Sequence, residues 1–269
     1  MKSIFSVTDD DLYMFFMPIV AWSWKRIGVD PIIIYVSTEA TTAVETSKFI
    51  LAGNYCPENA LIKEIKVKDK NQAATYSQVS RLFAGTLPDI DDKDVIMTAD
   101  ADMAVFGDYL LQGDIPLIQV FGDDLVDEAQ FPMCYISMTK SSWKTVMKIS
   151  SLYDMQAHLD ILLQPIVCEN MRGNYWAYDQ ETIYNNLVQS NLPILKHHRA
   201  NHPTQFATRR ADRDSWPATS PKNIIDAHLP RPGFLNDNFD KVFNLFEDIY
   251  PYDNIEWMKQ YREEYIKLL

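Results

Sequence analysis

Short apolar segments alternate with amphipathic segments in the first part of the chain. Ser3–Val7 alternates and is rich in β-forming residues, and Pro31–Val36 is continuously apolar, as expected of a strand buried on both faces. Between them, Leu12–Ile27 has apolar residues at helical spacing and is followed by Gly28, a common helix stop. This strand–helix–strand order predicts a parallel sheet with helices on its faces.

The same two patterns continue along the chain. Further strands are predicted at Leu61–Val67, Asp94–Thr98, Ile115–Val120, Pro132–Met138 and Ile194–His198, and further helices at Ala43–Ala52, Thr75–Thr86, Ser142–Leu152 and Gln180–Ser190. The polar, proline-containing Arg199–Pro221 indicates a long functional loop, and Phe239–Leu269 indicates one or two helices packed on the outside. We therefore expect an α/β domain over residues 1–235 and a C-terminal helical extension over 236–269.

Composition and charge narrow the class of protein. The 269 residues are 47% hydrophobic, enough for a substantial core, and carry a net charge of −12, which argues against a nucleic-acid partner because that requires a basic face. The three cysteines, Cys56, Cys134 and Cys168, have no metal-ligand spacing and are expected to be reduced thiols. No apolar run approaches the roughly 20 residues of a membrane span, and the opening MKSIFSVTDD does not resemble a targeting segment. We expect a cytoplasmic protein.

The strongest candidate for chemistry is VIMTADADMAVFGD, residues 95–108. A buried strand there delivers Asp100 and Asp102 to its carboxyl end, where open α/β sheets bind ligands. Residues two apart in an extended chain point the same way, so the two carboxylates, with the small Ala101 between them, can meet one hard cation such as Mn²⁺ or Mg²⁺. A pair of solvated loop aspartates is the alternative, because a lone D-x-D is common.

A second candidate is NIIDAHLPRPGF, residues 223–234. It places His228 at the end of an apolar stretch and Arg231 in a proline-framed turn. The imidazole suits a third metal ligand and the guanidinium suits a phosphate, although an isolated histidine is as often a structural hydrogen-bonding group.

A third candidate is YWAYDQETIY, residues 175–184, in which Asp179 and Glu181 follow three aromatic residues. Either carboxylate could act as general base toward a sugar hydroxyl, and Asp179 could equally be a helix cap with acidic residues in the first turn. Arg81 lies on the helix before the D-x-D, and Arg209, Arg210 and Arg213 lie in the polar loop, where they could close over a diphosphate or pair with nearby aspartates. The chain contains no GxGxxG, GxxxxGK[ST], GxSxG or HExxH motif.

Taken in order, these motifs resemble the GT-A glycosyltransferases, especially the family that includes glycogenin and bacterial galactosyl- and glucosyltransferases. The matching features, over residues 3 to about 234, are a first strand ending in VTDDDLY, the triplet Ser80-Arg81-Leu82, the D-x-D at Asp100 and Asp102, the pair Asp179-Gln180, and His228 before a Gly/Pro turn. The family's asparagine-containing N-x-G segment is absent near residues 134–138, and the lysine and tryptophan after its histidine–glycine motif are replaced by residues 231–234. These departures indicate a divergent branch. The expected form without a stem or membrane anchor is typical of a bacterium or a large DNA virus of algae.

The resemblance implies a GT-A fold, with a mostly parallel central sheet flanked by helices, and a hexosyl- or pentosyltransferase. By this analogy, Asp100, Asp102 and His228 bind Mn²⁺ (or Mg²⁺), and the donor is a UDP-sugar. The residues implied to contact the donor are Thr8, Asp9, Asp10, Arg81, Asp100, Ala101 and Arg231, with Asp179 and Glu181 as the catalytic carboxylates.

The expected reaction moves a sugar, with xylose and glucose as guesses, from UDP to a hydroxyl of a glycan or glycoprotein acceptor, and inversion is weakly favoured. The alternatives are a nucleotidyltransferase that makes a nucleotide-sugar and a non-catalytic sugar-binding protein on the same fold. The sequence leaves the oligomeric state open.

Overall fold

The computed structural model describes residues 1–68, 70–107, 110, 118–122, 129–149, 151, 154, 157, 160, 177–197, 210–217 and 224–269. Within these residues a central sheet of seven strands has the order β3-β2-β1-β4-β7-β6-β8. Its strands are β1 (Lys2–Thr8), β2 (Asp30–Thr38), β3 (Leu61–Val67), β4 (Val95–Thr98), β6 (Ile118–Phe121), β7 (Ile136–Thr139) and β8 (Ile194–His197). All neighbouring pairs are parallel except β4–β7 and β6–β7, in which β7 runs antiparallel. The predicted mostly parallel sheet is confirmed.

The neighbouring strands β1 and β2 are hydrophobic on both faces because a separate hydrophobic core lies on each side of the sheet. In β1, Phe5 faces one cluster of buried residues and Ile4 faces the other. In β2, Ile33 lies in the first cluster and Ile32 in the second. Side chains alternate between the faces of a strand, so the continuous apolar run is what burial on both faces requires.

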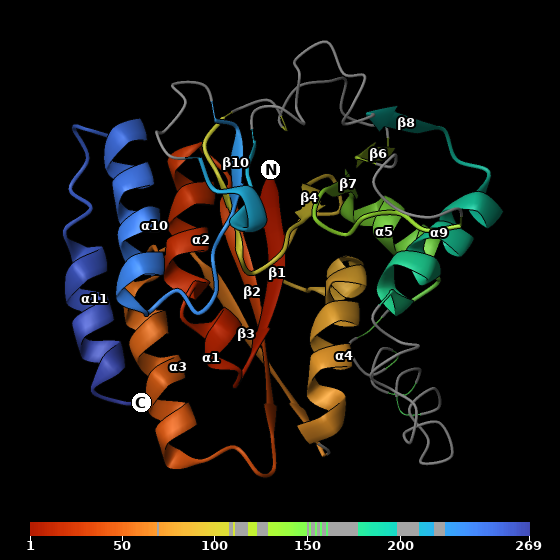
Figure 1. Cartoon of the computed structure of the whole chain (residues 1–269). Helices are drawn as coiled ribbons and strands as arrows, with labels where there is room; N and C mark the ends of the chain where they lie inside the picture. Colours follow the sequence, from red (N-terminus) through yellow and green to blue (C-terminus); the bar gives the residue numbers. More distant parts are fainter. Residues whose placement is uncertain are drawn as a thin grey trace.

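Helices cover both faces of this sheet (Figure 1). The main ones are α2 (Met17–Arg26), α3 (Ala43–Tyr55), α4 (Lys70–Ser80), α5 (Lys140–Met147), α9 (Tyr178–Ser190), α10 (Asn236–Ile249) and α11 (Trp257–Ile266). In the view of Figure 1, α2, α3, α10 and α11 lie on the left, and α4, α5 and α9 lie on the right. The predicted layered α/β architecture is therefore confirmed, while the domain boundary after residue 235 stays a prediction.

Local chemistry explains where two of these helices begin or break. The helix predicted over Leu12–Ile27 is divided into α1 (Asp11–Met14) and α2, with Pro18 in the first turn of α2. Proline is favoured there because the first-turn N–H groups have no helical partner. Helix α3 begins with a capping box, in which the Thr42 hydroxyl accepts from the Glu45 N–H and the Glu45 carboxylate accepts from the Thr42 N–H.

The structure also contains a second sheet of three short strands, which the hydrophobic pattern predicted only in part. It has the order β5-β10-β9, with β5 (Met103–Val105) antiparallel to β10 (Asp226–His228), and β10 parallel to β9 (Arg210–Ala211). The predicted loop over Arg199–Pro221 is thus wrong at residues 210–217, which hold β9 and the 3₁₀ helix η5 (Arg213–Ser215). The predicted helix Thr75–Thr86 is also two elements, α4 and the 3₁₀ helix η1 (Arg81–Thr86). In the described part of the chain, no helix combines the length and hydrophobicity that a membrane crossing needs.

Candidate active site

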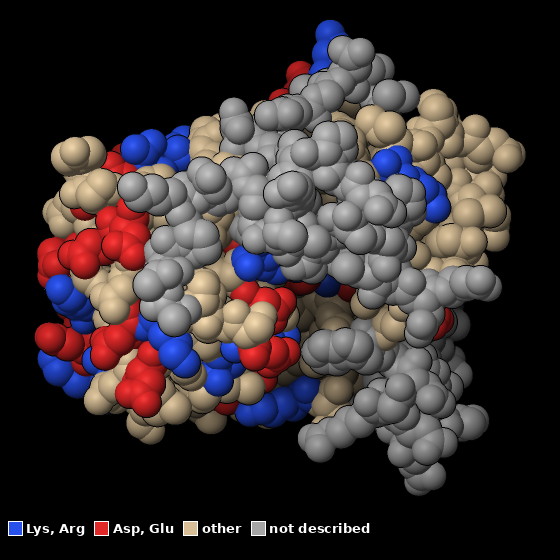
Figure 2. All heavy atoms as spheres, turned by 45° about the horizontal axis from the view of Figure 1, so that its top comes forward, with Lys and Arg blue, Asp and Glu red and all other residues tan. Residues whose placement is uncertain are grey.

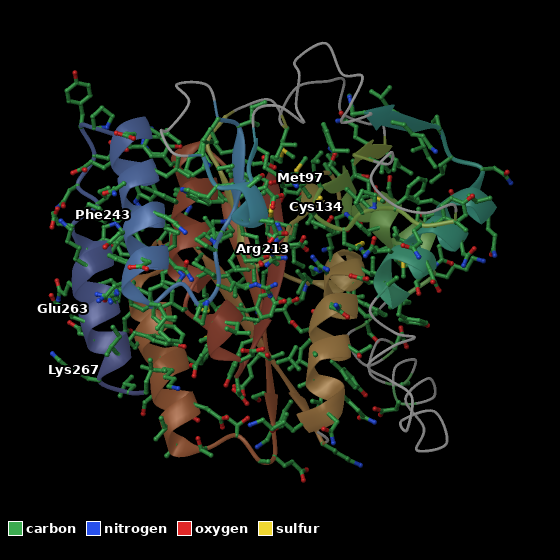
Figure 3. The ribbon with its side chains drawn as sticks, in the orientation of Figure 1. Met97, Cys134, Arg213, Phe243, Glu263 and Lys267 are labelled. Carbon is green, nitrogen blue, oxygen red and sulfur yellow. The ribbon has the colours of Figure 1, made fainter. Side chains whose placement is uncertain are left out.

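A cavity of about 280 Å³ opens where β1 and β4 end, the edge at which parallel α/β sheets bind ligands. Three groups of residues line it: Ser6, Val7, Thr8, Asp10 and Tyr13 from β1 and the start of α1; Ala74, Ser77, Gln78 and Arg81 from α4 and η1; and Asp100, Ala101, Asp102, Pro132, Met133, Cys134, Asp179, Gln180, Arg213 and His228 from later segments. Figure 3 labels two of these, Arg213 and Cys134, in the middle of the molecule. Residues far apart in sequence therefore converge on one space.

Arg81 is buried between two carboxylates of the cavity. Its Nη1 donates to the Asp100 carboxylate and, at 2.8 Å, to the carbonyl of Ala99, and its Nη2 donates to Oδ2 of Asp179 at 2.7 Å. Burial alone would lower the pKa of Arg81, but the charges of the two aspartates raise it above its ordinary value. The guanidinium thus stays charged and fixes the relative position of two predicted site residues.

Asp179 is held at both of its carboxylate oxygens. Besides the bond from Arg81 to Oδ2, Oδ1 accepts from the backbone N–H of Gln180 at 2.9 Å. Burial raises the pKa of Asp179, and the nearby Arg81 charge only partly opposes this effect. The side chain is 2% exposed yet borders the cavity, so it combines an elevated pKa with a fixed orientation.

Asp102 lies in a more cationic environment than Asp100. Its Oδ2 is 2.9 Å from Nη1 of Arg213, 3.4 Å from Nε2 of His228 and 3.4 Å from Nε of Arg231. Burial would raise the pKa of Asp102, but the hydrogen bond and charge of His228, followed by the charges of Arg231 and Arg213, lower the pKa below its ordinary value. This carboxylate is therefore ionised at neutral pH.

The pair Asp102 and His228 suits a divalent cation. Carboxylate oxygen and imidazole nitrogen are both ligands of Mn²⁺, and the 3.4 Å between these two atoms is short enough for both to approach one ion. Both aspartates of the motif are already paired with an arginine, Asp100 with Arg81 and Asp102 with Arg213. Among the described residues, no group of three His, Cys, Asp or Glu side chains is arranged as a metal site. The three-ligand set stays a prediction.

The other predicted donor-binding residues divide into two groups. Thr8, Asp10 and Ala101 line the cavity. Asp9 does not, because its carboxylate accepts from the hydroxyls of Tyr35 and Thr41.

Two further predicted residues also lie outside the lining. Arg231 approaches Asp102 without lining the cavity, and Glu181 is exposed in the first turn of α9. Arg209 and Trp176 lie outside the described residues.

The arginine cluster of the polar loop has two distinct roles in the structure. Arg210 forms a buried ion pair with Asp226, at 2.9 Å from Nε to Oδ1, and the hydroxyl of Tyr135 donates to the same carboxylate at 3.0 Å. Because Arg210 is on β9 and Asp226 on β10, this pair fixes the segment that carries Arg213 toward Asp102.

Sequence reasoning missed Tyr13, which lines the cavity beside Asp10. The guanidinium of Arg231 lies 4.7 Å from its ring centroid, within cation–π range. Burial raises the pKa of Tyr13, so the phenol stays protonated near neutral pH. The position of Tyr13 in helix α1, one turn after Asp10, is the signal that could have identified it.

The surface contains both signs of charge. Figure 2 shows acidic and basic side chains interspersed over the coloured part of the face in view. The cavity also contains both signs of charge, because Arg81 pairs with Asp100 and Arg213 pairs with Asp102.

No protein-family model matches the chain, and no curated protein matches it in sequence. The fold is similar to that of the galactosyltransferase LgtC solved in complex with donor and acceptor sugar analogues, with 14% identity, a TM-score of 0.47, and coverage of 97% of this chain and 100% of that chain. It is also similar to the glycosyltransferase GlyE of Streptococcus pneumoniae TIGR4, with 14% identity, a TM-score of 0.48, and coverage of 99% of this chain and 63% of that chain. Both neighbours are glycosyltransferases.

Proposed function

We propose that this protein is a metal-dependent glycosyltransferase that uses a UDP-sugar donor. The observation that carries the proposal is the separation of 3.4 Å between Asp102 Oδ2 and His228 Nε2, at the carboxyl end of the sheet. Mn²⁺ or Mg²⁺ is commonly held by one or two carboxylates plus substrate phosphates, so the oxygens of a diphosphate would complete this donor set. When bound, the cation neutralises charge on the departing nucleoside diphosphate.

Residues in and beside the cavity are suited to bind the phosphates and the nucleoside of the donor. Arg213 and Arg231 already direct positive charge at Asp102 and are suited to meet phosphate oxygens. Thr8 and Asp10 lie at the β1 end of the cavity and are candidates to contact the nucleoside. The site thus combines positively charged groups with hydrogen-bonding groups, as a nucleoside diphosphate requires.

Asp179 is proposed to orient Arg81 and the transferred sugar. Both of its carboxylate oxygens already accept hydrogen bonds, and the charge of Arg81 opposes the uptake of a proton from an acceptor hydroxyl. This arrangement favours the orienting role that a retaining reaction gives to Asp179 over the role of base in an inverting reaction. Glu181, exposed and outside the cavity, would need a change of position to serve as base.

Calorimetric titration with UDP, with and without Mn²⁺, tests the proposal. We expect binding that depends strongly on Mn²⁺ and is lost in the variant Asp102→Asn, whose fold is checked by circular dichroism because Asp102 is a buried partner of Arg213. Equal affinity in EDTA would refute the metal assignment. The measured hydrolysis of UDP-glucose and UDP-xylose then tests the donor: UDP binding without release of sugar from either would indicate a sugar-binding protein.

A further inference from the structure

The last helix of the described chain, α11, packs directly on the segment that follows the first strand. Phe15, between α1 and α2, is fully buried, and its ring is stacked on Tyr261 with 5.2 Å between centroids. The ring of Tyr265 meets Phe15 edge-on at the same centroid distance. Two aromatic residues one turn apart on α11 therefore hold the end of α1.

A polar contact extends this packing to α1 itself. The hydroxyl of Tyr265 donates to Oδ1 of Asp11 at 2.6 Å, and Nζ of Lys48 donates to both oxygens of Asp11 at 2.9 and 3.0 Å. Burial, followed by the hydrogen bond to Asp11, raises the pKa of Tyr265, which keeps the hydroxyl protonated as a donor. Asp11 lies between Asp10 and Tyr13, two residues that line the cavity.

The same helix also contacts the turn that carries Arg231. Nε of Arg262 donates to the carbonyl of Phe234 at 2.8 Å. Gly233 lies so close to the first helices that a Cβ atom there would be 2.3 Å from the ring of Phe16. The turn is thus enclosed between α11 and the α1–α2 junction, and its Arg231 projects to the ring of Tyr13 and to Asp102.

We propose that α11 is a positioning element for the Asp102 end of the cavity, with Tyr265 and Arg262 as its positioning residues. Tyr265 fixes α1 and so Tyr13, and Arg262 fixes the turn and so Arg231. The two supported side chains meet beside Asp102, where the proposed function places the donor's diphosphate, and the inference rests on that function. Figure 3 shows that Glu263 on α11 and Lys267, directly after α11, point outward instead.

The chain supplies a matched control for the Tyr265 hydroxyl. Tyr261 is also on α11, is also fully buried and also contacts Phe15, but its hydroxyl has no hydrogen-bond partner among the described residues. Tyr265→Phe and Tyr261→Phe therefore remove the same atom from similar surroundings. Only Tyr265→Phe removes a bond to α1.

Amide hydrogen exchange and titration with UDP in Mn²⁺ test the inference on the full chain. Tyr265→Phe should speed exchange over residues 11–16 and raise the Kd for UDP by about three- to tenfold, which corresponds to the typical net contribution of one hydrogen bond. Tyr261→Phe should match the wild type in both measurements. Arg262→Gln should speed exchange over residues 231–236, and the outward-facing control Glu263→Gln should not.

Each outcome separates the inference from the proposed function. Equal exchange over residues 11–16 in the two tyrosine variants would overturn the positioning role of α11. A drop in melting temperature of Tyr265→Phe with unchanged local exchange and unchanged Kd would also overturn it, because that pattern describes stability alone. If the wild type shows no Mn²⁺-dependent binding of UDP, the proposed function fails, while the exchange comparison still decides whether α11 fixes α1.

Discussion

Replacement of Arg81 by methionine is expected to destabilise the protein strongly. The guanidinium donates to Asp100, Asp179, the Ala99 carbonyl and, through Nε at 3.1 Å, the Gln78 carbonyl. Its removal leaves Asp179, only 2% exposed, without a cation. Breaking a buried pair from one side costs about 3–5 kcal/mol, and for a chain of this length each kcal/mol corresponds to about 2 °C in melting temperature. The melting temperature should fall by about 6–10 °C.

Calorimetric or circular-dichroism melting of three variants checks this reasoning. Arg81→Met with Asp179→Asn should recover part of the loss, because the uncompensated buried charge is then absent. Lys63→Met, which breaks the exposed pair with Asp89, should change stability by less than about 1 kcal/mol.

The pH dependence is a further check. Without Arg81, the pKa of Asp179 rises further in the folded state, so the deficit of the single variant should shrink as the pH falls from 8 to 5. A melting temperature of Arg81→Met within about 2 °C of the wild type would refute the account.

Three further variants test the packing and the buried charges. Gly233→Ala should lower the melting temperature, because its Cβ would lie 2.3 Å from the Phe16 ring and overpacking costs about 1–3 kcal/mol. Asp226→Asn should lower the free energy of unfolding in urea by about 3–5 kcal/mol, since it removes the carboxylate charge that pairs with the buried Arg210. Thr42→Ala should lower that free energy by about 1 kcal/mol through loss of the α3 cap. An unchanged urea midpoint in any of the three would contradict its stated cause.

The fold was predictable wherever burial follows a simple period. The run Pro31–Val36 and the segment Leu61–Val67 both form strands at or near the predicted bounds, because the parallel sheet buries them from one or both sides. The short strands β5, β9 and β10, two or three residues each, carry too little periodicity to be predicted with certainty. The antiparallel direction of β7 is likewise a tertiary property that no local pattern encodes.

The candidate site was predictable in its residues and less so in its pairings. The same cavity is lined by five predicted residues, Arg81, Asp100, Asp102, Asp179 and His228. Their positions at strand ends and helix starts were the signals that identified them. What the sequence could not supply was which carboxylate meets which cation.

Those pairings depend on contacts across large sequence separations. Arg81 joins Asp179 over 98 residues, and Arg213 joins Asp102 over 111 residues. Asp9 shows the same limit, since its hydroxyl partners lie on β2 and the following turn.

Strand β10 is made long after its antiparallel partner β5, so the groups around Asp102 are assembled late during synthesis. The D-x-D and Arg81 belong to the first 102 residues, whereas Arg213, His228 and Arg231 are made more than a hundred residues later. A nascent chain that ends before β10 holds both aspartates of the motif but lacks His228 and Arg231, two of the groups that face Asp102. Such an intermediate has less positive charge around Asp102, so under the proposed function its affinity for a diphosphate should increase when the late strand docks.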